Sequence, residues 1–205
     1  MSDFSAGYFT VSKYKDQVYP YLLAGEKFVA YNPQWVGKFS PQDMDDEPHP
    51  QTILLSRAVP LLHVIHAEDH GFNLRVYHQG KVQFAFDIPH MAGEELLFEL
   101  GQEKYGDEFF LDEGVMTALQ AEVDGILAQQ GVPHCFFEGI TREGLESFKL
   151  FDLPDDTLDK MMEILTVARY TAGSHQLVYD LLDTIGLTEF DFISYDYIDA
   201  KAHEI

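Results

Sequence analysis

The sequence predicts one α+β domain, in which an antiparallel sheet of four or more strands from the N-terminal half packs against helices from the C-terminal half. Apolar and polar side chains alternate between residues 72 and 87, as in half-buried strands. From residue 93 onward the apolar spacing changes to three and four residues, as in amphipathic helices. The length of 205 residues fits a single domain. We therefore expect a β-rich part over residues 1–90, a helix-rich part over residues 91–189, and a candidate last strand over residues 190–198.

The first 50 residues predict a short helix, one strand and a loop. Residues 12–24 favour a helix that ends or kinks at Pro20, because proline cannot donate a hydrogen bond inside a helix. Residues 27–31 favour a strand. The stretch 40–50 contains three prolines and four acidic residues, a composition that is typical of an exposed loop.

Four strands are predicted between residues 52 and 87. The first covers residues 52–57. Residues 61–66 are apolar on both faces, as expected for a strand in the interior of a sheet. A turn then leads into a hairpin made of residues 72–77 and 81–87.

The apolar side chains also indicate a register for this hairpin. A three-residue loop, His78-Gln79-Gly80, places the apolar residues of both strands on one face when Gly80 adopts the left-handed conformation. A two-residue loop would instead set apolar residues of one strand against polar residues of the other. The expected cross-strand pairs are therefore Val76 with Val82, Leu74 with Phe84, and Phe72 with Phe86.

Helices are predicted over most of the remaining chain. The apolar spacing favours helices near residues 96–100, 115–127, 158–168 and 177–185. Thr141 is the expected N-cap of a further short helix, since its hydroxyl can accept a hydrogen bond from a free backbone N–H group. Residues 132–137 favour a strand.

The charge of the chain excludes several classes of partner. There are 13 basic and 35 acidic side chains, which gives a net charge of −22, and residues 101–205 alone carry −16. Nucleic acids and anionic membranes attract clustered Lys and Arg, and the sequence contains no basic run. We therefore expect neither a nucleic acid nor a membrane as partner, whereas a basic protein is electrostatically favoured. Acidity that serves solubility alone is the alternative.

Three features predict a cytoplasmic protein. Cys135 is the single cysteine, so no intrachain disulfide can form. Residues 1–5 lack the basic and apolar regions of a secretory signal. No apolar run approaches the roughly 18 residues of a membrane span.

No motif of a common catalytic class is present. The chain lacks the nucleophile elbow of α/β-hydrolases, the glycine-rich loops that bind nucleotide phosphates, and the metal-binding helix of zinc proteases. The sequence therefore disfavours an enzyme and predicts no cofactor. An enzyme whose site is assembled from distant residues stays open.

One face of the predicted sheet carries polar side chains that could hold a small anion or a polar ligand. If His66 pairs with Phe72 on the neighbouring antiparallel strand, the same register sets His63 beside Arg75. Alternate residues of a strand share a face, so Asn73 and Tyr77 lie on the same face as Arg75. The same pattern also suits a solvated face, or a polar layer under helices that internal hydrogen bonds satisfy. The candidate ligand-binding residues are His63, Asn73, Arg75, Tyr77 and Gln83.

The densest group of residue types that bind metals follows the predicted interior strand. His63 and His66 point to opposite faces of a strand, so they cannot share a metal ion. His66 could meet Asp69 or His70 if the turn curls back, which makes these three residues weak metal candidates. The paired ligand motifs of zinc sites are absent, and we expect no metal.

These observations favour a non-catalytic acidic binding protein that engages a basic protein partner through residues 101–205. Its role would be regulatory or similar to that of immunity proteins, which cap bacterial toxins, although this likeness rests on composition alone. One alternative is a small-ligand-binding protein or enzyme that uses the histidine and arginine face of the sheet. Another is a self-associating structural protein, a homo-oligomer that pairs through residues 190–198.

Overall fold

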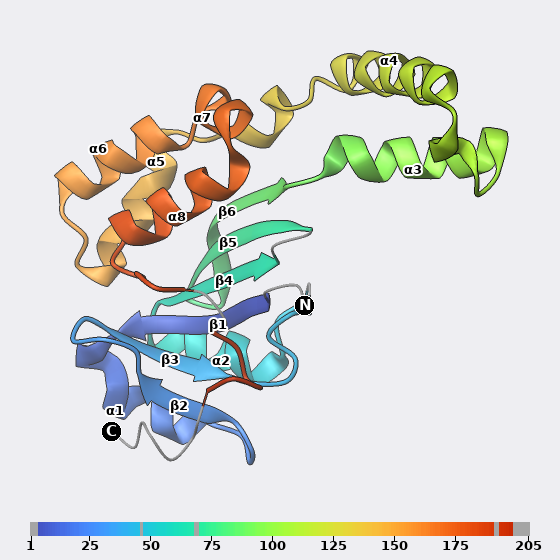
Figure 1. The fold of residues 1–205 in the computed structure, drawn as a ribbon. Helices are drawn as coiled ribbons and strands as arrows, with labels where there is room; N and C mark the ends of the chain where they lie inside the picture. The colour runs from blue at the N-terminus through green and yellow to red at the C-terminus, as the bar shows by residue number, and fades with distance from the viewer. Residues whose placement is uncertain (1–3, 46, 68–69, 191–192, 199–205) are drawn as a thin grey trace.

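The computed structural model describes residues 4–45, 47–67, 70–190 and 193–198 and has an α+β architecture (Figure 1). Within these residues, six antiparallel strands form one sheet in the order β2-β3-β1-β4-β5-β6. The strands are β1 (Phe4–Val11), β2 (Lys27–Ala30), β3 (Trp35–Phe39), β4 (Leu61–Ala67), β5 (Gly71–His78) and β6 (Lys81–Pro89). The sheet belongs to the N-terminal half and most helices follow it, as the sequence predicts.

Helices cover both faces of the sheet. One face is covered by η1 (Ser12–Tyr14), α1 (Lys15–Val18), η2 (Tyr19–Tyr21) and α2 (Pro50–Ala58). The other is covered by η4 (His134–Phe137), α5 (Arg142–Leu145), η5 (Glu146–Phe151), α6 (Asp155–Ile164), α7 (Val167–Ala172) and α8 (Ser174–Thr184). Between these groups the chain forms α3 (Ala92–Tyr105), η3 (Phe109–Leu111) and α4 (Glu113–Gln129), which extend beyond the sheet (Figure 1). None of the described helices is both long and apolar enough to cross a membrane.

The main core lies between the sheet and the C-terminal helices. Trp35 is completely buried there, and its indole Nε1 donates a hydrogen bond to the Ile185 carbonyl oxygen at 3.1 Å. Its ring packs against Phe151, with centroids 5.3 Å apart. Because Trp35 belongs to β3 and Ile185 follows α8, this bond joins the two halves of the chain.

The interior strand matches its prediction. β4 lies between β1 and β5, and all seven of its residues are buried. Its register against β5 pairs His63 with Arg75 and His66 with Phe72, as expected. Apolar side chains on both faces therefore identified an interior strand correctly.

The predicted register of the β5–β6 hairpin is wrong. The turn has two residues, Gln79 and Gly80, both with positive φ (55° and 75°). Beyond the turn, β6 contains one extra residue, Gln83, where the register shifts in a β-bulge. A two-residue turn alone would set the apolar residues of β5 against polar residues of β6. The extra residue shifts the register by one, so the apolar residues of both strands share one face. The observed pairs are Val76 with Phe84, Leu74 with Phe86 and Phe72 with Ile88.

Three further predictions are corrected. Residues 52–57 belong to helix α2, because Pro50 starts a helix and the His49 ring Nδ1 accepts a hydrogen bond from the Gln51 N–H at 3.1 Å. Residues 132–137 contain the 3₁₀ turn η4. The described part of residues 190–198 contains no strand and ends in a turn. It contacts the sheet through one backbone hydrogen bond, in which the Ile193 carbonyl oxygen accepts from the Ala6 N–H of β1 at 2.7 Å.

Candidate functional site

Two of the predicted ligand-binding residues are buried beneath the N-terminal helices and loops. The His63 ring stacks on Tyr8, with centroids 4.1 Å apart, and its Nε2 contacts the Asp43 carbonyl oxygen at 2.8 Å. A carbonyl oxygen only accepts, so His63 Nε2 carries the proton. Tyr77 is buried in the same layer as Tyr8 and Leu55.

The other three predicted residues lie nearer the surface and contact protein groups. Asn73 Nδ2 donates to the Asp87 carboxylate at 2.5 Å, and Arg75 Nη2 lies 3.3 Å from the same oxygen. Gln83 sits at the bulge and donates to the His78 carbonyl oxygen at 3.1 Å. The structure thus brings His63, Asn73, Arg75 and Tyr77 to one face, and ligand binding by this face stays a prediction.

A network of buried charges lies beside His63. Lys38 Nζ is 2.8 Å from Glu26 and 3.8 Å from Asp43, and all three side chains are almost fully buried. Asp43 also accepts hydrogen bonds from the backbone N–H and the hydroxyl of Ser40, at 2.7 and 2.6 Å. Part of the predicted exposed loop is therefore buried, because Asp43 folds back onto Lys38.

Burial shifts two pKa values in this network in opposite directions. It raises the pKa of Asp43 to about 6, although Lys38 and the Ser40 hydrogen bonds oppose the shift. It lowers the pKa of His63 to about 4, although the contact with the Asp43 carbonyl opposes that shift. Both groups are therefore less ready to ionise than they would be in water. Internal hydrogen bonds satisfy this layer only in part, since the buried His63 Nδ1 has no hydrogen-bond partner among the described residues.

Among the described residues, the structure does not place the weak metal candidates His66 and His70 in one metal-binding group. His70 is exposed, with Nδ1 3.8 Å from Glu95 Oε1, and Asp69 lies outside the described residues. His66 is buried, and its ring lies beside those of His90 and His175, with centroids 5.4 and 6.2 Å away. The sequence pattern missed the last two because they lie far from His66 along the chain.

The most exposed part of the structure is the segment 92–129, here called the arm, which contains α3, η3 and α4. Asp112 caps α4, since its carboxylate accepts hydrogen bonds from the N–H groups of Gly114 and Val115 at 2.8 and 3.1 Å. Gly106 ends α3 with a positive φ of 78°. These capping residues define two antiparallel helices that reach away from the sheet (Figure 1).

The arm buries little of its own surface. All its residues are described, and the buried ones are Gly101, Phe109, Leu119 and Val123. Four large apolar side chains are each more than half exposed: Phe98, Tyr105, Phe110 and Leu111. Large exposed apolar side chains on one short segment supply the kind of surface that interaction sites use.

The arm is also strongly acidic. It contains ten acidic side chains and one basic one, so it carries −9 of the net charge of −22. Lys104 pairs with Glu122, and Glu95 lies near His70. No other ion pair of the arm is found among the described residues, so most of these carboxylates face solvent without a cationic neighbour.

A pocket at the base of the arm combines both properties. Met91 and Phe98 supply its apolar surface, and three acidic side chains, Glu94, Glu95 and Glu99, line it as well. Its volume is about 530 Å³. The pocket is shallow and open, and its lining residues lie at the start of α3 and along its first turns. Apolar and carboxylate side chains placed side by side suit Lys or Arg, whose stem is apolar and whose end is charged.

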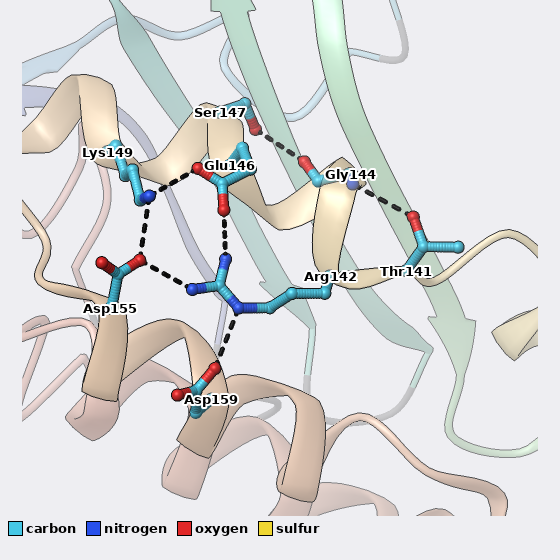
Figure 2. Close-up of polar contacts among 8 residues, drawn as sticks. All are labelled: Thr141, Arg142, Gly144, Glu146, Ser147, Lys149, Asp155 and Asp159. Carbon is cyan, nitrogen blue, oxygen red and sulfur yellow. Dashed lines mark hydrogen bonds and ion pairs between the residues drawn. The ribbon is translucent and has the colours of Figure 1, made fainter.

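The acidic residues of the C-terminal helices are placed differently (Figure 2). Arg142 lies 2.6 Å from Glu146, 2.8 Å from Asp155 and 2.9 Å from Asp159. Lys149 contacts Glu146 and Asp155 at 2.6 and 2.9 Å. Two cations thus balance most of the charge of these three carboxylates, so the unpaired negative charge is concentrated more strongly on the arm.

The arm could have been found from the sequence by counting charges in shorter windows. The count over residues 101–205 omitted three acidic residues, Glu94, Glu95 and Glu99, which precede that boundary.

Comparison of the chain with family models, curated proteins and solved structures finds no match.

Proposed function

We propose that this is a non-catalytic binding protein that engages a basic protein partner through the arm. The observation that carries the proposal is the coincidence, on one projecting segment, of a −9 charge and four exposed large apolar side chains. Unpaired carboxylates steer a cationic partner toward the arm, and desolvation of aromatic side chains supplies most of the affinity.

The partner surface that fits is an amphipathic segment with Lys or Arg beside apolar residues. The pocket of Met91, Phe98 and the three glutamates accepts one cationic side chain. The exposed rings of Tyr105 and Phe110 offer further faces for cations or apolar groups. An acidic surface that served solubility alone would not need large apolar side chains among its charges.

Affinity capture with variants of the full chain tests the proposal. The arm variant carries Phe98→Ser, Phe110→Ser and Leu111→Ser, and the matched control carries Leu54→Ser and Val82→Ser, which alter exposed apolar residues of the main body. Captured proteins are identified and quantified at low salt and at ~0.5 M salt, where charges are screened beyond about 4 Å. We expect basic proteins that the wild type and the control retain and the arm variant loses.

A defined probe complements the capture. Fluorescence anisotropy measures the binding of a labelled helical peptide with Lys on one face and Leu on the other, and of a matched peptide with Glu in place of Lys. The variant Glu94→Gln/Glu95→Gln/Glu99→Gln should bind the basic peptide at least about tenfold more weakly than the wild type, mainly through slower association. Equal capture by the arm variant, indifference to salt, or equal binding of both peptides would each refute the proposal.

A further inference from the structure

We propose that His66, His90 and His175 form a binding site for a divalent transition-metal ion, with Zn²⁺ as the expected occupant. Within the described residues, these three are the group whose ligand atoms lie close enough together to hold a metal ion. His66 belongs to β4, His90 directly follows β6, and His175 lies in the first turn of α8. The site is separate from the arm and does not depend on the function proposed for it.

The geometry requires a small closure. One ring nitrogen of each histidine lies within 4.8 Å of those of the other two. Ligand nitrogens around a tetrahedral Zn²⁺ with bonds of about 2.0–2.1 Å lie about 3.3 Å apart, so the rings must approach by at most about 1.5 Å. His175 is half-buried at the start of a helix, and rotation of its side chain can supply this movement.

The backbone around His90 is fixed by hydrogen bonds to two other elements. The His90 N–H donates to the His70 carbonyl oxygen at 3.0 Å, which ties it to the start of β5. The Tyr170 hydroxyl donates to the Pro89 carbonyl oxygen at 2.7 Å, which ties the same segment to α7. His90 is therefore held beside His66 and His175 by contacts that do not involve its ring.

The His90 ring itself is unusual. Both its nitrogens, Nδ1 and Nε2, are buried and have no hydrogen-bond partner among the described residues. A buried polar atom without a partner is unfavourable, and a metal–nitrogen bond would satisfy one of the two.

The ligand types determine the class of metal. Three imidazoles without a carboxylate or thiolate favour Zn²⁺, Cu²⁺ or Ni²⁺ over Mg²⁺ and Ca²⁺, which prefer oxygen ligands. Three protein ligands leave a fourth position for water. Tyr179, one turn after His175, packs edge-on against His66 with centroids 5.4 Å apart and bounds the site on that side.

Metal titration of the untagged, chelator-treated full chain tests this site. Isothermal titration with Zn²⁺ should show one ion bound per chain, and Co²⁺ should give the intense visible absorption of a four-coordinate site. His175→Ala should weaken Zn²⁺ binding by at least about a hundredfold, because even the outer partners of metal ligands are worth about 10- to 100-fold. The matched control is His70→Ala, an exposed histidine outside the group.

Circular dichroism checks that each variant is folded. If His175→Ala fails to fold, the wild-type stoichiometry and Co²⁺ spectrum decide the question alone. Binding of less than one Zn²⁺ per chain, a Co²⁺ spectrum of a six-coordinate ion, or equal Zn²⁺ affinity in His175→Ala and His70→Ala would overturn the proposal. Those results would leave the three rings as an aromatic cluster.

Discussion

His63 stacks face to face on Tyr8, with ring centroids 4.1 Å apart and an interplanar angle of 5°. The stack lies on the sheet face that α2 covers, and both side chains are almost fully buried. A protonated imidazole in this place would lose its hydration without gaining an anionic partner, since its ring nitrogen faces a neutral carbonyl. The neutral form of His63 is therefore part of the folded state.

This burial makes His63 a source of acid sensitivity. Its folded-state pKa of about 4 lies below the ordinary value of 6.5, so the unfolded chain takes up a proton first as the pH falls. Stability is lost between these two values, by an amount on the order of 3 kcal/mol. Urea denaturation across this pH range should show a weaker acid dependence in His63→Phe than in the wild type. Parallel pH profiles of the two proteins would contradict the assignment.

Protonation of Asp43 should change the stability of the fold in the opposite direction. Its folded-state pKa of about 6 exceeds the ordinary value of 3.8, so the folded chain takes up a proton first. Stability therefore rises as the pH falls from about 6 to about 4, and Asp43→Asn removes this gain. The variant should be more acid-sensitive than the wild type in the same urea experiment. Asp45→Asn, at an exposed position of the same loop, is the control and should follow the wild type.

Substitution by alanine should have opposite effects on stability at two glycines of the arm. A Cβ atom on Gly101 would lie 2.5 Å from ring carbons of Phe109, so Gly101→Ala must displace that ring and should cost about 1–3 kcal/mol. A Cβ atom on Gly125 meets nothing within 4 Å, so Gly125→Ala should stabilise α4 by up to about 1 kcal/mol. Amide hydrogen exchange should speed up in the arm for the first variant and slow down for the second. Faster exchange throughout α6 and α8 would show instead that the arm and the body unfold together.

The ion pairs of Arg142 should contribute weakly and depend on salt. Its three carboxylate partners are exposed, so water and ions screen them (Figure 2). Arg142→Gln should lower the melting temperature slightly at low salt and not at all at ~1 M salt. Lys160→Gln removes one positive charge at an exposed position of α6 and serves as control. A loss that persists at high salt would mean that Arg142 acts through packing.

Patterns among near neighbours predicted much of this fold. Two-sided apolar character identified β4, and helical spacing identified α4 and α8. The helix predicted near residues 158–168 is two helices, because α6 ends at Ile164 and Thr166 caps α7. Thr141 is an N-cap as expected, since its hydroxyl accepts a hydrogen bond from the Gly144 N–H at 3.0 Å. Each of these signals depends on residues within a few positions of one another, and tertiary contacts reinforce it.

Short segments were predicted less well, because several structures fit the same few residues. Residues 52–57 contain Thr, Ile and Leu, which suit a strand, and their length does not separate strand from helix.

The predicted register of the β5–β6 hairpin was wrong for another reason. Gln79 adopts a positive φ that is uncommon for its residue type, and the bulge at Gln83 has no marker in the sequence.

The candidate metal site could not be predicted from local spacing. His90 and His175 meet His66 because β4 and β6 lie in one sheet and α8 packs over it, and these relationships are properties of the topology. The arm lies between the elements that local patterns predict and the candidate metal site that only the topology reveals. Its charges are visible in the sequence, whereas its separation from the body depends on how α3 leaves β6.

The two ends of the arm lie next to each other. A Cβ atom on Gly93, near the start of α3, would be 3.5 Å from a side-chain carbon of Leu127, near the end of α4. The chain therefore departs from the body and returns to it at nearly the same place (Figure 1). A change in the length of this hairpin would therefore leave the connections of the strands and of the covering helices in place.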